Sequence, residues 1–363
     1  MTSPAFGRFF LPGPTEVHPD VLAAGAQPMI PHRGKAMVDL LTRCAAPLSR
    51  LLRTERRVLI GTCSATGFME MAVRSGIRQR ALSIVTGAFG ERFAAIVAAC
   101  GREVVRLDVP LGQTVEPEML RDAIRRSDVD AVTIVHSETS TGALAPMREL
   151  AAVVHEFGDV MLLVDAVTSA AGSPVETDAW GLDFVFTGSQ KALDLPPGLA
   201  LGVASPRMLE RANGIPERGA YLDLVAHEEA AADAQPTNTP GISLLFGLDA
   251  QLQRIEKEGG AEARWRRHDA MRQVVERWTE GAGAKLGVSY LPVVGRRSWT
   301  VSCLRLPEGK GAKAVVQAAA KEGWTIGSGY GKLKESTIRI GHMGDHTPDR
   351  VTELLGVLER ALA

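Results

Sequence analysis

The chain has 363 residues, a length that allows one large domain with a substantial core and a smaller second domain. Hydrophobic residues make up 45% and charged residues 23%, and the formal net charge is -1, so no overall field recruits nucleic acid or an anionic membrane. Aromatic residues make up only 5%, which argues against a surface that stacks nucleic-acid bases.

The cysteines are widely separated and none forms a C-x-x-C pair, a pattern that favours reduced, buried thiols. They are Cys44, Cys63, Cys100 and Cys303. The first residues lack a basic segment followed by a long apolar one, and no apolar run approaches the roughly 20 residues that span a bilayer. We therefore expect a soluble, cytoplasmic protein.

Near the N-terminus, prolines on both sides of Gly13 restrict the backbone, while the glycine permits close approach of a ligand. A plain N-terminal loop is the alternative. Residues 37–53 then predict an amphipathic helix, because apolar residues recur along one helical face.

Residues 58–60 predict a short strand, and a helix begins near Phe68. The loop between them contains Ser64, Ala65 and Thr66. Small and hydroxyl-bearing residues before a helix leave N–H groups exposed at its positive end, so this loop is a candidate anion cradle. Ordinary N-capping by Ser64 or Thr66 is the alternative.

Residues 82–85 predict the next strand, and Phe89 follows on a turn flanked by glycines. Such an aromatic side chain can lie flat over a planar ring, with a core aromatic as the alternative. The α/β pattern continues with strands at 103–107 and 131–135 and helices at 117–126 and 146–157. Thr139 belongs to a polar cluster after the strand at 131–135, where its hydroxyl could equally satisfy a turn.

The stretch from residue 160 to 195 carries the strongest chemical pattern. Residues 160–164 predict a buried strand, and Asp165 follows at its carboxyl end, where open α/β sheets bind ligands. After a segment predicted to be helical, residues 184–186 predict a second strand, which leads to Gln190 and Lys191. An acid and an amine thus reach the same edge of one sheet.

This pairing has a specific chemical use. A lysine amine can form a Schiff base with pyridoxal phosphate, and a carboxylate can keep the pyridine nitrogen protonated so that the ring accepts electrons. Val167 is expected on the same side of a continuing strand as Asp165. Taken alone, Lys191 and Asp165 would be a solvated lysine and an aspartate that caps a turn, but their joint pattern favours a cofactor site.

Beyond this stretch, residues 227–235 predict an Ala-rich surface loop. The polar turn at 235–241, which includes Thr239, precedes a long helix at 242–258 and is either an anion site or a simple cap. Neither G-x-G-x-x-G nor G-x-x-x-x-G-K-[ST] occurs anywhere in the chain, which removes the standard dinucleotide and nucleoside-triphosphate sites.

Gly259 and Gly260 end that helix and mark the candidate start of a smaller domain. Its predicted elements are helices at 261–282 and 312–322 and strands at 298–306 and 337–340. Arg339 is a planar two-pronged donor suited to a carboxylate, with a surface ion pair as the alternative. His342 and His346 lack a third ligand at suitable spacing, so we expect no metal site.

The run VDAVTSAAGSPVETDAWGLDFVFTGSQKALDLPPGLA, together with Glu-Thr-Ser-Thr-Gly at 138–142 and Arg-Ile-Gly at 339–341, resembles the class V aminotransferases of pyridoxal-phosphate fold type I, in particular their alanine–glyoxylate / serine–pyruvate branch. The resemblance extends over nearly the whole chain. It implies an α/β fold whose large domain, residues 16–257, has a mostly parallel seven-stranded sheet. A smaller α+β domain would combine residues 1–15 with 258–363.

The resemblance also implies roles for single residues. Lys191 would hold pyridoxal phosphate and act as general base and then acid, while Asp165 would keep the ring nitrogen protonated. Phe89 and Val167 would pack on the two faces of the ring, and Thr139 would bind its hydroxyl. The implied phosphate contacts are Ser64, Ala65, Thr66, Gln190 and, from the second subunit of a homodimer, Thr239. Arg339 and Gly13 would face the substrate.

The implied substrates are a small amino acid, alanine or serine, and a 2-oxo acid, glyoxylate or pyruvate, in a ping-pong reaction. Alternatives on the same fold are a phosphoserine or aminoethylphosphonate aminotransferase and a cysteine desulfurase or lyase. A desulfurase needs an acceptor cysteine on a mobile loop, whereas Cys303 is predicted in mid-strand. A non-catalytic regulatory protein that binds pyridoxal phosphate is an alternative of another class.

Overall fold

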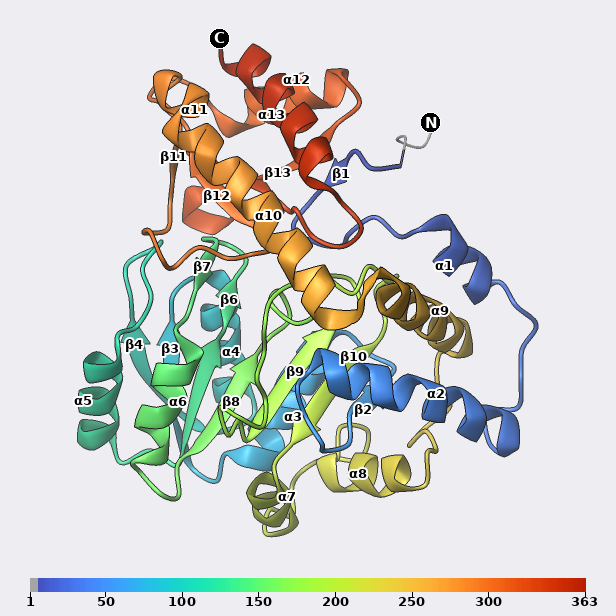
Figure 1. The fold of residues 1–363 in the computed structure, drawn as a ribbon. Helices are drawn as coiled ribbons and strands as arrows, with labels where there is room; N and C mark the ends of the chain where they lie inside the picture. Colours follow the sequence, from blue (N-terminus) through green and yellow to red (C-terminus); the bar gives the residue numbers. More distant parts are fainter. Residues whose placement is uncertain (1–5) are drawn as a thin grey trace.

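The computed structural model describes residues 6–363, so residues 1–5 of the predicted small domain lie outside it. The larger part of the molecule is built on one seven-stranded sheet (Figure 1). Its strands, in spatial order, are β2 (Leu59–Gly61), β10 (Ala200–Ala204), β9 (Phe184–Gly188), β8 (Met161–Asp165), β5 (Ala131–Val135), β3 (Arg80–Val85) and β4 (Glu103–Asp108). Only β10 runs opposite to the other six strands, so the predicted mostly parallel sheet is confirmed.

Helices cover both faces of this sheet, and the strand residues alternate between the two cores. Leu162 and Val164 of β8 pack with α5 (Pro117–Ser127) and α6 (Met147–His155), whereas Met161 and Leu163 pack on the opposite face. That second face is covered by α3 (Ala65–Gly76), α4 (Ala88–Ala99) and α7 (Pro206–Asn213). Burial on both faces explains the continuous apolar runs of the sequence.

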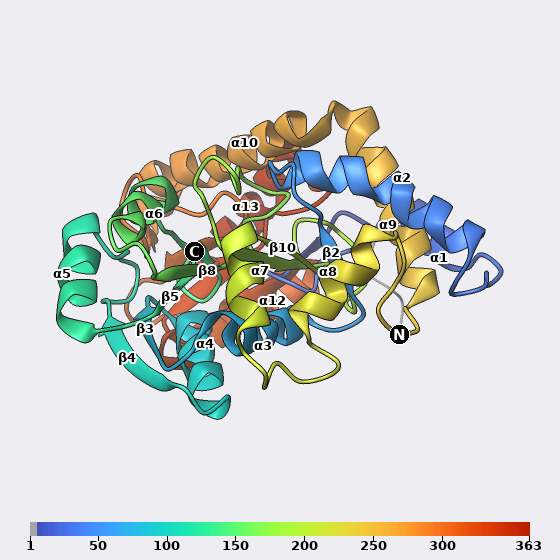
Figure 2. The same cartoon turned by 90° about the horizontal axis from the view of Figure 1, so that it is seen from below.

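A further group of helices lies at the β2 end of the sheet, away from α5 and α6 (Figure 2). Its members are α1 (Pro19–Gly25), α2 (Lys35–Leu51), α8 (Leu224–Ala232) and α9 (Ile242–Glu258). The apolar face of α2 packs against α9 and against β10 and β2, as the spacing of its apolar residues predicts.

The smaller part has a second sheet, whose strands are β1 (Phe9–Phe10), β13 (Thr325–Ser328), β14 (Thr337–Ile340), β12 (Ser302–Arg305) and β11 (Ser289–Tyr290). It packs with α10 (Gly260–Glu280), α11 (Ala282–Lys285), α12 (Ala312–Lys321) and α13 (Pro348–Leu362). Because β1 pairs with β13, the N-terminal segment joins the C-terminal elements. The predicted domain division at residues 257 and 258 falls at the end of α9 and stays a prediction.

Several local predictions were wrong. Residues 166–183 form turns rather than a helix, since Ala171 has a left-handed φ of +65 and Pro174 has no N–H to donate. The predicted surface loop at 227–235 is mostly the helix α8, which Asp223 caps by accepting a hydrogen bond from the N–H of Val225.

The predicted strand at 298–306 is shortened to β12, and two cysteines, Cys63 and Cys100, are partly exposed rather than buried. Within residues 6–363, no helix is both long and apolar enough to cross a membrane.

Candidate active site

A cavity of about 300 Å³ opens at the carboxyl ends of β5 and β8, where a sheet of this type binds its ligands. Most of the predicted site residues line it together, although they come from segments far apart in the sequence. These are Gly13, Ser64, Ala65, Thr66, Phe89, Thr139, Asp165, Val167, Gln190 and Lys191. The structure therefore brings the predicted acid and amine into one cavity.

Lys191 follows β9, and its side chain is buried in this cavity. Its Nζ donates a hydrogen bond to the carbonyl oxygen of Pro12. Burial and, to a lesser extent, the charge of Arg339 lower the pKa of Lys191 to about 8, with the charge of Asp165 opposing both. A lysine held close to its neutral form is suited to attack a carbonyl carbon.

Asp165 is the last residue of β8, and its Oδ1 accepts a hydrogen bond of 2.8 Å from the N–H of Val167. The strand ends there, so the prediction that Val167 lies on a continuing strand is wrong, although Val167 still lines the cavity. Burial raises the pKa of Asp165 to about 7, and the Val167 N–H opposes this rise. A buried carboxylate of this kind fits a protonated pyridine nitrogen, whose charge would compensate its burial.

Ser64 is the N-cap of α3, but its side chain makes no capping hydrogen bond, so the capping alternative for Ser64 is wrong. The first turn of α3, with Ala65 and Thr66, lines the cavity together with Gln190. Free helical N–H groups, hydroxyls and an amide at the positive end of a helix fit a phosphate group.

Gly13 lies directly against Lys191. It has a φ of +100, and a Cβ atom there would lie 2.5 to 2.7 Å from Cδ, Cε and Nζ of Lys191. The segment is fixed by Thr15, whose N–H donates to the carbonyl of Gln190 at 3.1 Å and whose hydroxyl donates to the carbonyl of Lys191 at 3.1 Å. Gly13 is therefore part of the cavity wall rather than of a plain loop.

Arg339 lies on β14 beside the cavity, and it makes no ion pair within the described part of the chain. Its Nε donates to the carbonyl of Ser328 at 2.9 Å and its Nη1 to that of Thr139 at 3.3 Å. These bonds hold the guanidinium in place, so the surface ion-pair alternative is wrong. The hydroxyl of Thr139 is hydrogen-bonded to that of Thr168.

The aromatic ring of Phe89 is surrounded by Lys191, Tyr330 and Arg92. The Nζ of Lys191 is 5.8 Å from the centroid of its ring. Tyr330 stacks on it with centroids 6.1 Å apart, and the guanidinium of Arg92 lies 4.9 Å from the centroid. Phe89 is thus a wall of the cavity and not a core aromatic.

Sequence reasoning missed Arg92, Tyr330 and Glu138. Arg92 follows Phe89 by three residues on one helix, a spacing that could have pointed to it. Tyr330 comes from the C-terminal part and had no local signal. Glu138 was noticed only as part of a motif, yet it is buried behind Phe89.

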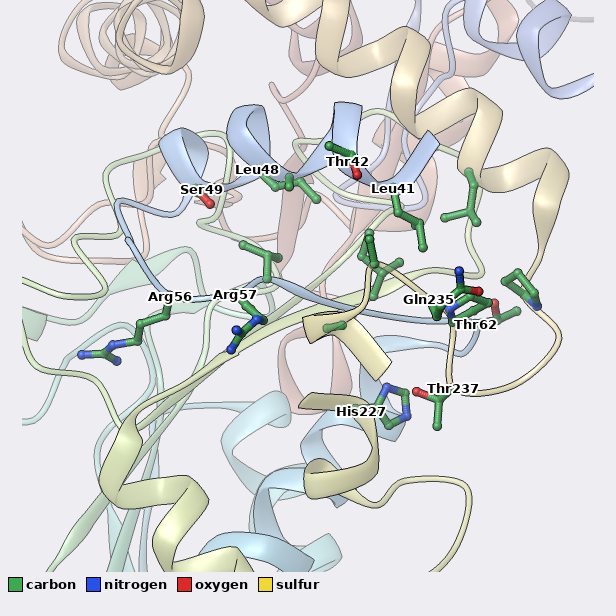
Figure 3. A pocket seen from close by; sticks show the side chains of 18 of the residues that line it. Leu41, Thr42, Leu48, Ser49, Arg56, Arg57, Thr62, His227, Gln235 and Thr237 are labelled. Carbon is green, nitrogen blue, oxygen red and sulfur yellow. The ribbon is translucent and has the colours of Figure 1, made fainter. Parts of the chain in front are cut away.

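Thr239 does not line this cavity in its own chain. It lines a small cavity beside β2 with Asn238 and Tyr221. Next to it, a larger cavity of about 290 Å³ lies between α2, β2, α8 and the loop at 235–241, with Thr62, His227 and Gln235 among its lining residues (Figure 3). A contact of Thr239 with a second subunit stays a prediction.

The two histidines considered as metal ligands take part in other contacts. The ring Nε2 of His342 is 2.8 Å from the hydroxyl oxygen of Ser302, and the ring Nε2 of His346 is 2.9 Å from the carbonyl oxygen of Phe9. Within residues 6–363, no three His, Cys, Asp or Glu side chains are grouped to hold a metal ion.

Comparison with known proteins gives the family. Residues 31–289 match the family described as Aminotransferase class-V. An uncharacterized aminotransferase of Methanocaldococcus jannaschii is 36% identical over 358 residues, which cover 97% of this chain and 91% of that protein.

Two solved structures are similar over their whole length. The aspartate aminotransferase of subgroup IV from Thermus thermophilus has a TM-score of 0.89 and 34% identity, covering 98% of this chain and 99% of that one. The alanine–glyoxylate aminotransferase from Nostoc sp. has a TM-score of 0.92 and 29% identity, covering 100% and 96%. The chain therefore belongs to the class V aminotransferases, with pyridoxal-phosphate fold type I, and is a pyridoxal-phosphate-dependent transaminase.

Proposed function

We propose that this transaminase moves an amino group between a small amino acid, alanine or serine, and glyoxylate or pyruvate. The supporting observation is the size of the cavity, about 300 Å³, at the lower end of the range for ligand pockets. Since pyridoxal phosphate must share this space and Gly13 lies against Lys191, little room remains for a large substrate side chain. The Nostoc neighbour is named for alanine and glyoxylate.

In this proposal Lys191 holds pyridoxal phosphate covalently, and Asp165 faces the ring nitrogen. The bound cofactor supplies an electron sink that stabilises negative charge at the substrate Cα. Once released, the neutral amine of Lys191 would take the proton from the substrate Cα and, acting as an acid, deliver it to C4′ of the cofactor.

The remaining predicted residues orient the two ligands. Phe89 and Val167 pack on the faces of the ring, and Thr139 binds its hydroxyl. Arg339 binds the substrate carboxylate, because its guanidinium is fixed by two backbone carbonyls. Phosphate is held by Ser64, Ala65, Thr66 and Gln190.

The proposal includes a homodimer in which Thr239 contacts the phosphate of the second subunit. Its loop is anchored beside its own phosphate cradle, since the N–H of Gly241 donates to the hydroxyl of Thr62 at 2.9 Å. Hybrid dimers of Lys191→Ala and Thr239→Ala chains provide the test, because one of their two sites then has both native residues. Activity in the hybrids, with little in either parent, supports the shared site, and its absence contradicts it. The cytoplasmic location remains a prediction.

A second candidate substrate is an acidic amino acid, and Arg92 is the observation in its favour. Arg92 lines the cavity, is exposed, and has no hydrogen-bonded or ion-paired partner within residues 6–363. It could bind a side-chain carboxylate while Arg339 binds the α-carboxylate. The Thermus thermophilus neighbour is named for aspartate.

Other class V reactions have less support. A desulfurase needs an accessible thiolate, but Cys303 is fully buried and burial raises its pKa to about 11. A phosphoserine or aminoethylphosphonate aminotransferase would need a second phosphate site beside Arg339, and apart from Lys191 the only cation along the cavity wall within residues 6–363 is Arg92.

A half-reaction screen tests these substrate proposals. Single amino acids are added to the holoenzyme, and conversion to the pyridoxamine form is followed by visible absorbance. Conversion by alanine or serine supports the first proposal, and conversion by aspartate alone, lost in Arg92→Leu, supports the second. Binding of the cofactor without conversion by any amino acid would point to the regulatory alternative.

A further inference from the structure

Glu138 is a buried carboxylate that lies behind the cavity rather than in its lining. It belongs to the two-residue strand β6 (Ser137–Glu138) and is 1% exposed. Its Oε2 accepts hydrogen bonds of 3.1 Å from the N–H groups of both Phe89 and Gly90. Its Oε1 accepts bonds of 3.0 and 2.5 Å from the N–H and hydroxyl of Ser140.

These bonds fix the first turn of α4 from outside the helix. The N-cap residue Gly87 has no side chain to cap the helix, and Glu138 satisfies two of the free N–H groups instead. Ser140 binds a third N–H group of this turn, because its hydroxyl oxygen accepts a 3.0 Å hydrogen bond from the N–H of Ala88. A negative charge at this end of a helix is also favourable.

The backbone at Gly87 is packed tightly against Glu138 and Ser140. A Cβ atom on Gly87 would lie 2.4 Å from Oγ of Ser140 and 2.6 Å from Cδ of Glu138, so the chain passes directly against the carboxylate. The held turn contains Phe89, whose ring faces Lys191 and Tyr330, and Arg92 lies one turn later.

We infer that Glu138 is a positioning residue, which holds the start of α4 so that the Phe89 ring keeps its place in the wall of the cavity that would hold the cofactor. The inference rests on the proposed binding of pyridoxal phosphate at Lys191. Glu138 does not line the cavity, so it positions the Phe89 ring through the turn that carries it. Besides the larger effect of burial, its charge also raises the pKa values of Asp165 and Lys191.

A double-mutant cycle tests this inference on the holoenzyme. Glu138→Gln keeps the shape but turns an N–H₂ group toward N–H donors, and Phe89→Leu removes the ring. Two quantities are measured for each variant: the visible circular dichroism per bound pyridoxal phosphate, and the rate at which pyridoxal phosphate is lost on dilution. Each single change should weaken the dichroism and speed the loss by on the order of tenfold.

The double variant should resemble Phe89→Leu alone, and a second cycle with Ser140→Ala, which loosens the same turn but keeps the charge of Glu138, should give the same result. Effects that multiply would overturn the inference. Asp130→Asn is the matched control, since Asp130 also accepts bonds from three backbone N–H groups, of Arg78, Gln79 and Arg80, but lies at the opposite end of the strands. Asp130→Asn should change neither the visible circular dichroism nor the rate at which pyridoxal phosphate is lost.

The experiment also distinguishes a failure of the proposed function from a failure of the role of Glu138. If Glu138→Gln does not fold, Ser140→Ala takes its place in the cycle, because it removes one donor to Glu138 and the acceptor for Ala88. If the native chain itself gains no visible absorbance with pyridoxal phosphate, the proposed function fails. If the native chain gains it and the cycle is additive, only the role of Glu138 fails.

Discussion

Two buried groups of charges differ in their partners, and they meet where Lys191 belongs to one group and the carbonyl of the next residue, Ala192, binds the other. In the cavity, Lys191 donates only to a backbone carbonyl, and Asp165 accepts only one backbone N–H within the described residues. Next to it, the buried side chain of Arg264 donates to the carbonyl of Ala192 at 2.7 Å and lies 3.2 Å from Asp345 and 3.3 Å from Glu258.

This difference in partners indicates that the group around Arg264 stabilises the fold, whereas Lys191 and Asp165 form a reactive site. The charges around Arg264 compensate one another and tie α10 to the segment that carries Lys191. Burial drives both charged groups in the cavity toward their neutral forms, because no side chain compensates them fully. We expect substitutions in the first group to change stability and those in the second to change chemistry.

The largest effect should come from Lys191→Ala. Loss of the amine removes both the covalent link and the proton carrier, so transamination should fall by at least about 10⁴-fold while the free energy of unfolding is nearly unchanged. Steady-state assays and urea titration measure the two quantities. Lys35→Ala, at an exposed lysine, is the control and should retain activity. Substantial residual turnover in Lys191→Ala would place the chemistry elsewhere.

Arg264→Met should lower the free energy of unfolding by about 3–5 kcal/mol, because Asp345 and Glu258 would lose a buried partner. The control is Arg43→Met, which breaks a more exposed pair with Asp249 and should cost about 0–1 kcal/mol. Urea denaturation of both variants measures the difference. Equal losses would show that the Arg264 group is no more important for stability than a surface pair.

Asp165→Asn should have opposite effects on stability and on catalysis. The folded pKa of Asp165 is raised to about 7, above its unfolded value, so the cofactor-free protein loses stability as pH rises from about 4 to 7. Asparagine removes this loss and should stabilise the cofactor-free protein at pH 8 by on the order of 4 kcal/mol. Activity should still fall on the order of 10²–10³-fold.

Urea titrations of the cofactor-free native chain and of Asp165→Asn at several pH values test this prediction. The two stability curves should converge near pH 4 and separate as pH rises to 7. Parallel curves would mean that Asp165 is already compensated in the folded protein.

The smallest effect should come from Gly13→Ala. The new methyl group meets Lys191 within 2.7 Å, so covalent incorporation of pyridoxal phosphate should slow by about 10-fold or more, beyond the backbone strain of about 1 kcal/mol. Gly34 has nearly the same φ of +97 but nothing within 4 Å of its Cβ position. Gly34→Ala therefore shares the strain without the clash, and equal rates in the two variants would contradict the role of Gly13.

Local sequence patterns predicted much of this molecule. The apolar runs before Asp165 and Lys191 gave strands that end at one edge of the sheet, and the small residues at the start of α3 line the cavity, while their role as an anion cradle stays a prediction. Prediction was wrong where local propensity was weak or overridden, as at 166–183 and 227–235.

Contacts between distant segments could not be predicted. Nothing near Glu138 in the sequence shows that its carboxylate binds the turn of Phe89, 49 residues away. Likewise, α10 contains many arginines, and only the fold shows that Arg264 is the one buried against Ala192. The resemblance to a family placed Arg339 beside the site, which its strand pattern alone did not.

The central claim is that Lys191 is the residue that binds pyridoxal phosphate. Reduction of the native protein with borohydride in the presence of pyridoxal phosphate, followed by peptide mass spectrometry, tests it directly. We expect a single phosphopyridoxyl group on the peptide that contains Lys191. A label on another lysine, or none on Lys191, would contradict the account.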